Sequence, residues 1–149
     1  MRVVKSARLP AGIAVALVAI AGFTGCASTT SSLRQAASDA RSAAETAQLA
    51  MIQQRDDSTF LTTTQTALGD AITELGAAEQ AATELQAATP AETAEQKSTL
   101  RAIRDATDAV LAAQRSVAAD AGRAVPALRS TAATLTKLAD RLERAEKQQ

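Results

Sequence analysis

Histidine, tryptophan and tyrosine are absent from this chain of 149 residues, and cysteine occurs once. The absence of histidine removes the usual imidazole metal ligand and the usual general base near neutral pH. The two aromatic residues, Phe23 and Phe60, lie far apart in the chain and offer no platform on which sugars or nucleic-acid bases could stack. These absences argue against a metal centre and against nucleic-acid binding.

The chain also lacks the short motifs that accompany catalysis. A single cysteine excludes a disulfide within the chain, and no Gly-rich phosphate loop or nucleophile motif occurs. The acids Glu74, Glu79 and Glu84 are spaced by five, which rotates them around a helix instead of gathering them at one metal site. We therefore expect no enzyme activity, no metal and no cofactor.

The amino-terminal segment is the clearest signal in the sequence. Arg2, Lys5 and Arg8 precede an apolar run over residues 9–23, and the small residues Thr24–Cys26 follow it. An apolar run of this length is short for a membrane span, which needs ~20 residues. The order of basic, apolar and small residues is the layout of a secretory signal peptide, so we expect an exported protein.

The tetrad Phe23-Thr24-Gly25-Cys26 resembles the lipobox of bacterial lipoproteins. Thr24, Gly25 and Cys26 match that pattern, whereas Phe23 stands where Leu or a β-branched residue is usual. The resemblance implies a diacylglycerol on the Cys26 sulfur, cleavage before Cys26 and an often acylated new amino terminus. It further implies a membrane-anchored protein on the extracytoplasmic face of the cell membrane. The resemblance covers the targeting segment only.

Two alternatives remain open for this segment. Cleavage could follow Ala27 through the general signal peptidase, or the segment could stay uncut as a membrane anchor. On the lipoprotein interpretation, the chain divides into a signal peptide at 1–25, a lipidated cysteine with a short tether at 26–32, and a helical domain at 33–149. Residues 26–149 hold 13 Lys and Arg against 16 Asp and Glu, a net charge of −3 that does not favour nucleic acid as a partner.

Composition and periodicity predict an all-α fold. Alanine is the best helix former, and apolar residues recur at helical spacing in four segments. Four helices with short links predict an up-down four-helix bundle. Its predicted core includes Leu33, Ala37, Ala40, Ala44, Ala47 and Met51, then Leu61, Leu68 and Leu75, then Ile103, Ala106, Val110, Ala113 and Val117, and finally Leu128, Leu135, Leu138 and Leu142.

Capping residues predict where the helices begin. Ser32 to Gln35 fits a capping box for the first helix, Asp57 or Ser58 suits the cap of the second, and Thr89-Pro90-Ala91-Glu92 fits a capping box for the third. Gly122 and Pro126 predict a break before the fourth helix. The alternative is three long helices, the last of them kinked at Pro126.

The topology groups residues at two ends of the bundle. Met51, Ile52, Phe60 and Val125 are expected at the end away from the lipid, where they either plug the core or form a docking patch for an envelope protein. Basic residues near the carboxyl terminus are expected on the membrane side, where they complement the helix dipole or touch anionic headgroups. The four charge pairs expected at i, i+4 spacing are Arg101–Asp105, Arg104–Asp108, Asp140–Arg144 and Glu143–Lys147.

Two functions are compatible with these features. The first is a lipid-anchored structural or interaction module, attached to the membrane through Cys26, that scaffolds an unidentified partner. The second is a carrier that binds an apolar ligand in a cavity lined by Leu68, Leu75, Val110 and Leu135. Because many predicted core positions are alanine, the buried apolar area is small, and self-association is a further possibility.

Overall fold

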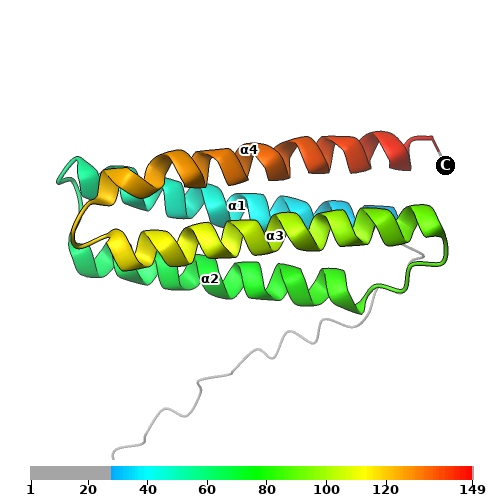
Figure 1. The fold of residues 1–149 in the computed structure, drawn as a ribbon, viewed down its shortest axis with the longest axis horizontal. Coiled ribbons are helices and arrows are strands. Elements are labelled where there is room, and N and C mark those ends of the chain that lie inside the picture. Colours follow the sequence, from blue (N-terminus) through cyan, green and yellow to red (C-terminus); the bar gives the residue numbers. More distant parts are fainter. Residues whose placement is uncertain (1–27, 149) are drawn as a thin grey trace, which may run out of the picture.

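The computed structural model describes residues 28–148, which form four α-helices and no strand. Consecutive helices run antiparallel along a common long axis (Figure 1). The predicted all-α four-helix bundle is confirmed, and the alternative with three long helices is wrong because the chain turns between Ser116 and Ala121. The helices are α1 (Thr29–Arg55), α2 (Leu61–Glu84), α3 (Pro90–Ser116) and α4 (Ala121–Glu146).

The signal peptide predicted at 1–25, the predicted lipidation site Cys26 and residue 27 lie outside the described residues. The structure therefore bears on the part of the chain that follows them. Among residues 28–148, no helix is both long enough and apolar enough to cross a membrane.

The α1 helix is the centre of the bundle. It contacts its neighbours α2 and α4 and also reaches α3 across the diagonal, whereas α2 and α4 lie at opposite corners without contact. Alanine side chains let α1 approach three helices at once, because a single methyl group takes up little space between the helix backbones. The buried alanines of α1 are Ala36, Ala37, Ala40, Ala43, Ala44, Ala47 and Ala50.

Large side chains from every helix fill the centre of the bundle. The fully buried ones include Leu33, Met51, Leu68, Leu75, Ile103, Val110, Leu128, Leu135 and Leu142. These positions were all predicted from helical spacing, and they are confirmed. Leu61 is the exception, because 36% of its surface is exposed at the start of α2. Within residues 28–148, the core cluster lies between Leu33 and Leu142, so the bundle has a hydrophobic core of its own.

Two helix starts differ from the sequence prediction. Ser28, and not Ser32, caps α1: its Oγ accepts a hydrogen bond from the Ser31 N–H at 3.1 Å, so the helix begins four residues earlier than predicted. The Gln35 side chain donates to Asp39 Oδ1 instead of reaching back to Ser32. The predicted tether at 26–32 is correspondingly shorter, since residues 29–32 are helical.

The break before α4 exists, but other residues form it. Asp120 caps the helix by accepting a hydrogen bond from the Arg123 N–H at 3.1 Å, which places Gly122 and Pro126 inside α4. A Cβ at Gly122 would lie 3.4 Å from Arg55 Cδ, an ordinary van der Waals contact with a flexible side chain, so the space at this position does not require glycine. By contrast, the predicted capping box at Thr89–Glu92 is confirmed.

We expect Leu135→Ala to lower the free energy of unfolding by about 2–5 kcal/mol, because it removes a fully buried side chain from a close-packed core. Leu49→Ala is the matched control; Leu49 is 56% exposed, so its loss should change stability by less than about 0.5 kcal/mol. Urea unfolding followed by far-ultraviolet circular dichroism measures both. Equal effects of the two substitutions would contradict the described core.

Candidate functional site

The helix topology separates two ends of the bundle. The amino-terminal end holds Ser28, the 85–89 connection and the carboxyl end of α4, and the far end holds residues 56–60 and 117–120 (Figure 1). Ser28 follows the predicted lipidation site Cys26 by two positions. A modification at Cys26 would thus be joined almost directly to the amino-terminal end.

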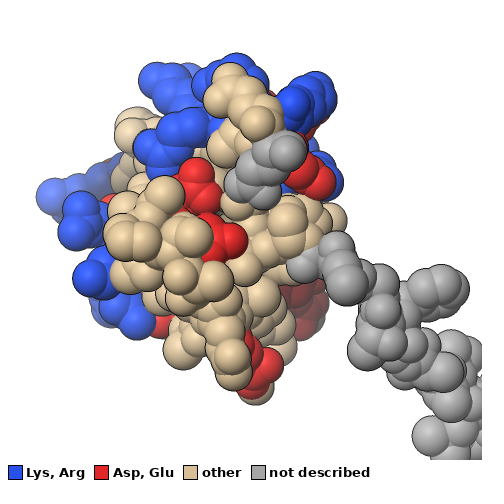
Figure 2. Space-filling view, turned by 90° about the vertical axis from the view of Figure 1, so that its right-hand side faces the viewer, with Lys and Arg blue, Asp and Glu red and all other residues tan. Residues whose placement is uncertain are grey.

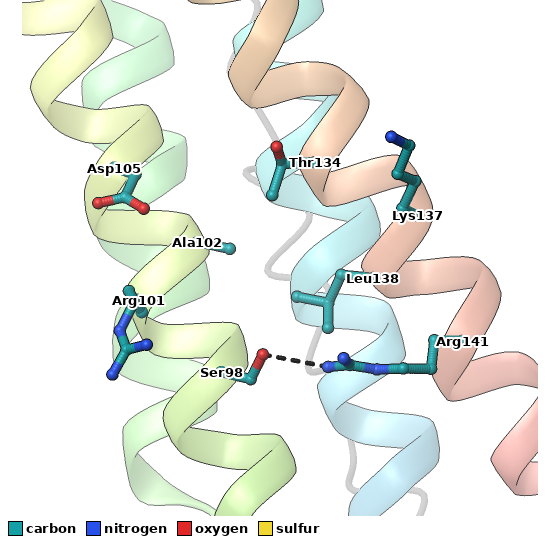
Figure 3. Close-up of a pocket in the computed structure, with 8 residues that line it drawn as sticks. All are labelled: Ser98, Arg101, Ala102, Asp105, Thr134, Lys137, Leu138 and Arg141. Carbon is teal, nitrogen blue, oxygen red and sulfur yellow. Dashed lines mark hydrogen bonds between the residues drawn. The ribbon is translucent and has the colours of Figure 1, made fainter.

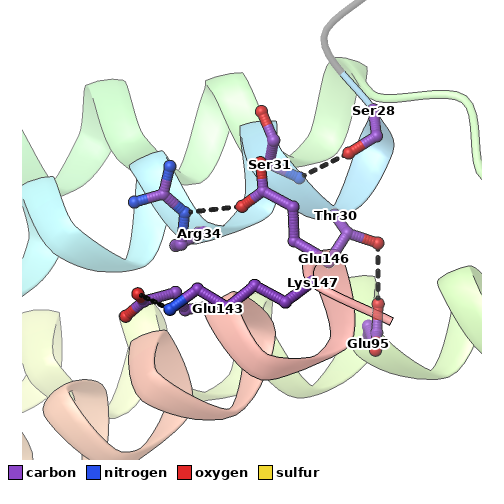
Figure 4. Close-up of polar contacts among 8 residues, drawn as sticks. All are labelled: Ser28, Thr30, Ser31, Arg34, Glu95, Glu143, Glu146 and Lys147. Carbon is purple, nitrogen blue, oxygen red and sulfur yellow. Dashed lines mark hydrogen bonds and ion pairs between the residues drawn. The ribbon is translucent and has the colours of Figure 1, made fainter. Parts of the chain in front are cut away.

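Polar contacts tie the helices together at the amino-terminal end (Figure 4). Arg34 Nε of α1 lies 3.0 Å from Glu146 Oε2 of α4, and the Thr30 hydroxyl donates to Glu95 Oε2 of α3 at 3.4 Å. Arg34 and Glu146 are more than one-third exposed, so this pair contributes little to stability. The contacts nonetheless hold the start of α1 in register with α3 and α4.

The far end presents one large aromatic side chain. Phe60 is 82% exposed, and its neighbour Leu61 is 36% exposed. Ile52 is half-buried and packs against the core, whereas Met51 and Val125 are buried within it. The prediction that these residues gather at one patch therefore needs a correction: Met51 and Val125 fill the core, and Phe60 does not plug it.

The loop that carries Phe60 is held by its own hydrogen bonds. The Ser58 hydroxyl and its N–H both donate to the Gln53 carbonyl at 2.9 Å, and Asp57 adopts a positive φ of 52°. Neither residue caps α2 as predicted; Phe60 takes the N-cap position without a side-chain bond. The Thr64 hydroxyl donates to Gln54 Oε1 at 3.1 Å, which fastens the start of α2 to the end of α1.

A second candidate surface lies between α3 and α4 (Figure 3). We call this hollow of about 270 Å³ the α3–α4 groove. Arg141 crosses it and donates to Ser98 Oγ at 3.1 Å. It is lined by Ser98, Arg101, Ala102, Asp105, Thr134, Lys137, Leu138 and Arg141. Sequence reasoning missed the groove, although Lys137 and Arg141 are spaced i, i+4 on α4.

Most of the predicted charge pairs do not form. Of the four, only Glu143–Lys147 is present, at 2.6 Å. Arg104 pairs with Glu79 of α2 at 2.6 Å instead of with Asp108 of its own helix. Arg104 thus pairs with an acid on a neighbouring helix instead of with the acid four residues away on its own helix. Sequence spacing alone does not indicate such a pair.

The residues expected to line a carrier cavity have no exposed surface. Leu68, Leu75, Val110 and Leu135 are all fully buried. They line none of the described hollows, which include the α3–α4 groove and a second surface hollow between α1 and α2. Within residues 28–148, no group of three His, Cys, Asp or Glu side chains is close enough to hold a metal ion.

Comparison with known proteins found no matching family model, no similar curated protein and no similar solved structure. The candidate surfaces therefore have to be interpreted from their own chemistry.

The capping box of α3 makes stability depend on pH. Backbone N–H donation from Ala88 at 2.8 Å, with further donation from Thr89, lowers the pKa of Glu92 below its ordinary value of 4.5. The stabilisation is present above the ordinary pKa and is lost as the pH falls through the lowered pKa. We expect Glu92→Gln to lower the melting temperature at pH ~7 and to have little effect at pH ~2.

Thermal melts of the parent chain and of Glu92→Gln across this pH range test the prediction. Glu74→Gln is the control, because the Glu74 carboxylate accepts no hydrogen bond within residues 28–148. A difference between the parent and Glu92→Gln that stays constant with pH would contradict the role of the ionised carboxylate.

Proposed function

We propose that this chain is a lipid-anchored protein of the bacterial cell envelope whose helical bundle binds or scaffolds a protein partner. The anchor is Cys26, in the segment that resembles a lipobox. Because only Ala27 and Ser28 separate Cys26 from α1, the amino-terminal end would lie within about 10 Å of the modified residue. The far end lies about 40 Å along α1 from that point.

The exposure of Phe60 is the observation that carries the binding role. Aromatic side chains are usually at least partly buried, and buried aromatic anchors often dominate the energy of protein interfaces. Phe60 is 82% exposed beside the exposed Leu61, in a loop that hydrogen bonds hold in place. This part of the far end, together with the half-buried Ile52 near the end of α1, is the proposed partner contact.

A carrier function has weaker support. A site for an apolar ligand needs a cavity of roughly 300 Å³ or more with apolar walls. The interior positions that would line it are occupied by close-packed Leu and Val side chains. The described hollows are open and carry charged residues on their walls.

Cys26→Ala should abolish incorporation of labelled fatty acid and release the protein from the membrane fraction. The physical reason is that two or three acyl chains bind a bilayer nearly irreversibly, and this substitution removes their attachment atom. Metabolic labelling and fractionation of cells that express the full chain measure the two effects. Continued labelling of the Cys26→Ala chain would refute the anchor.

Phe60→Ala should weaken capture of a partner by about 30-fold or more, because truncation of an interface hot spot costs ~2 kcal/mol or more. Stability should change little, since Phe60 is exposed. Crosslinking in the native envelope, followed by mass spectrometry, identifies the partner and measures capture. Leu49→Ala is the control for loss of an exposed apolar side chain on another part of the bundle. Early melting of Phe60→Ala, or equal capture by both variants, would contradict the proposed contact.

A further inference from the structure

Charge is distributed unequally among the four helices. Residues 121–147, which form α4 and its C-cap, contain six Lys and Arg against three Asp and Glu. The α2 helix contains four Asp and Glu and no Lys or Arg. These helices occupy opposite corners of the bundle, so one side is basic and the other acidic. Figure 2 shows basic side chains over the upper part of the end view, where α4 lies, and none in its lowest part, where α2 lies.

Ion pairs do not neutralise the basic side. Within residues 28–148, the cations in ion pairs are Arg34, Arg41, Arg55, Arg104 and Lys147. All three cations of α1 are thus paired. The cations of this part of the chain that form no ion pair all lie on α3 and α4, and they are Lys97, Arg101, Arg115, Arg123, Arg129, Lys137, Arg141 and Arg144.

The unpaired cations of α4 form a continuous exposed row. We call Arg123, Arg129, Lys137, Arg141 and Arg144 the α4 basic stripe. All five are exposed, and their helical positions lie away from the buried leucines of the same helix. The stripe extends for about 31 Å along the bundle, and two acids lie within its span: Asp140, and Glu143, which pairs with Lys147. A flat anionic surface could contact the whole row at once.

The α3–α4 groove adds a site for a single anionic group beside this stripe. Lys137 and Arg141 belong to both, and Arg101 lines the groove on the α3 side (Figure 3). The hydroxyls of Ser98 and Thr134 lie between the two helices. Three cations and the Ser98 hydroxyl, offset by the carboxylate of Asp105, suit the oxygens of a phosphate group. The Thr134 hydroxyl donates to the Ser130 carbonyl at 3.0 Å and so is not a donor to the groove.

We propose that the α4 basic stripe and the α3–α4 groove bind the phosphate headgroups of an anionic lipid bilayer. The bundle then lies on its side, with α4 against the lipid and the acidic α2 facing away. Phe60, at the start of α2, stays accessible in this orientation. Membrane binding by basic residues does not require the Cys26 anchor, so this inference stands apart from the proposed function.

The acidic face of a second copy is a weaker occupant than a bilayer. The most acidic helix of a second copy is α2, which has four acids. One of them, Glu79, already pairs with Arg104. The three remaining acids span Asp70 to Glu84, about 21 Å, which is shorter than the stripe. A bilayer places phosphates along the full length of the stripe.

The test uses the bundle without the amino-terminal segment, residues 28–149, because the whole described core lies within it. Vesicles of phosphatidylcholine with about 30% phosphatidylglycerol are compared with pure phosphatidylcholine by co-sedimentation. We expect binding to the anionic vesicles at low salt, loss of that binding at about 0.5 M salt, and no binding to the neutral vesicles.

The diagnostic variant is Arg129→Gln/Lys137→Gln/Arg144→Gln. Each basic residue near an anionic bilayer contributes about a fivefold factor, so we expect roughly 100-fold weaker partitioning. The control is Arg41→Gln/Arg55→Gln/Arg104→Gln, which has the same net charge but removes cations outside the stripe. It should bind nearly as well as the parent, and circular dichroism checks that both variants fold.

Three results would overturn the proposal. Equal binding to neutral and anionic vesicles would show that charge is not the cause. Equal losses in the two variants would show that net charge, and not the stripe, decides binding. Salt-sensitive dimers in sedimentation velocity without vesicles, dispersed by the stripe variant and accompanied by no vesicle binding, would assign the stripe to a second copy of the chain.

Discussion

The close packing of α1 is the constraint on which the rest of the structure depends. Its buried face consists largely of alanine, with Leu33 and Met51 as the large side chains near its two ends. The short methyl groups let α1 contact α2, α3 and α4 together, and large residues such as Leu135 from the other helices pack onto this face. Apolar burial is therefore concentrated in a small number of Leu, Ile and Val residues, which explains why single core truncations should be costly.

Antiparallel packing also decides what each end of the bundle can do. The amino-terminal end is closed by polar contacts between α1, α3 and α4, including the Arg34–Glu146 pair. The far end has a short hydrogen-bonded loop that leaves Phe60 in solvent while Met51 is covered. On the proposed function, the attachment point and the partner contact would lie at opposite ends of the bundle.

The charge asymmetry of the surface is a consequence of where ion pairs form. Glu79 of α2 neutralises Arg104 of α3, whereas the outer face of α4 has few acids nearby. Exposed pairs of this kind contribute little to folding stability, so surface charges can be rearranged without a large change in the free energy of unfolding. The shape of the bundle and its charge distribution are therefore largely independent features, and surface charge can serve binding without weakening the core.

Local features of the fold could be predicted from the sequence because they depend on a few neighbouring residues. The capping box of Thr89 and Glu92 needs only four residues, and the seven-residue spacing of Leu68 and Leu75 places them on one helix face in any context. Helix number, helix type and most of the core follow from such patterns. The lipobox resemblance is equally local and remains a prediction about residues outside the described part.

The start of α1 and the exposure of single apolar residues depend on contacts between helices. Ser28 and Ser32 are both suitable caps for α1. The helix begins after Ser28, and Thr30 in its first turn is buried against the bundle. Met51 and Phe60 are both apolar residues near a turn, and only the position of the neighbouring helices decides that the first is covered and the second exposed.

The sequence by itself determined four amphipathic helices, their approximate ends and their buried faces, because helical periodicity and capping act over short distances. The tertiary structure decided which apolar residues reach solvent, which ion pairs form and where the unpaired cations gather. The reason is that these properties depend on distances between residues far apart in the chain, such as Arg104 and Glu79, which only the packing of one helix against another specifies.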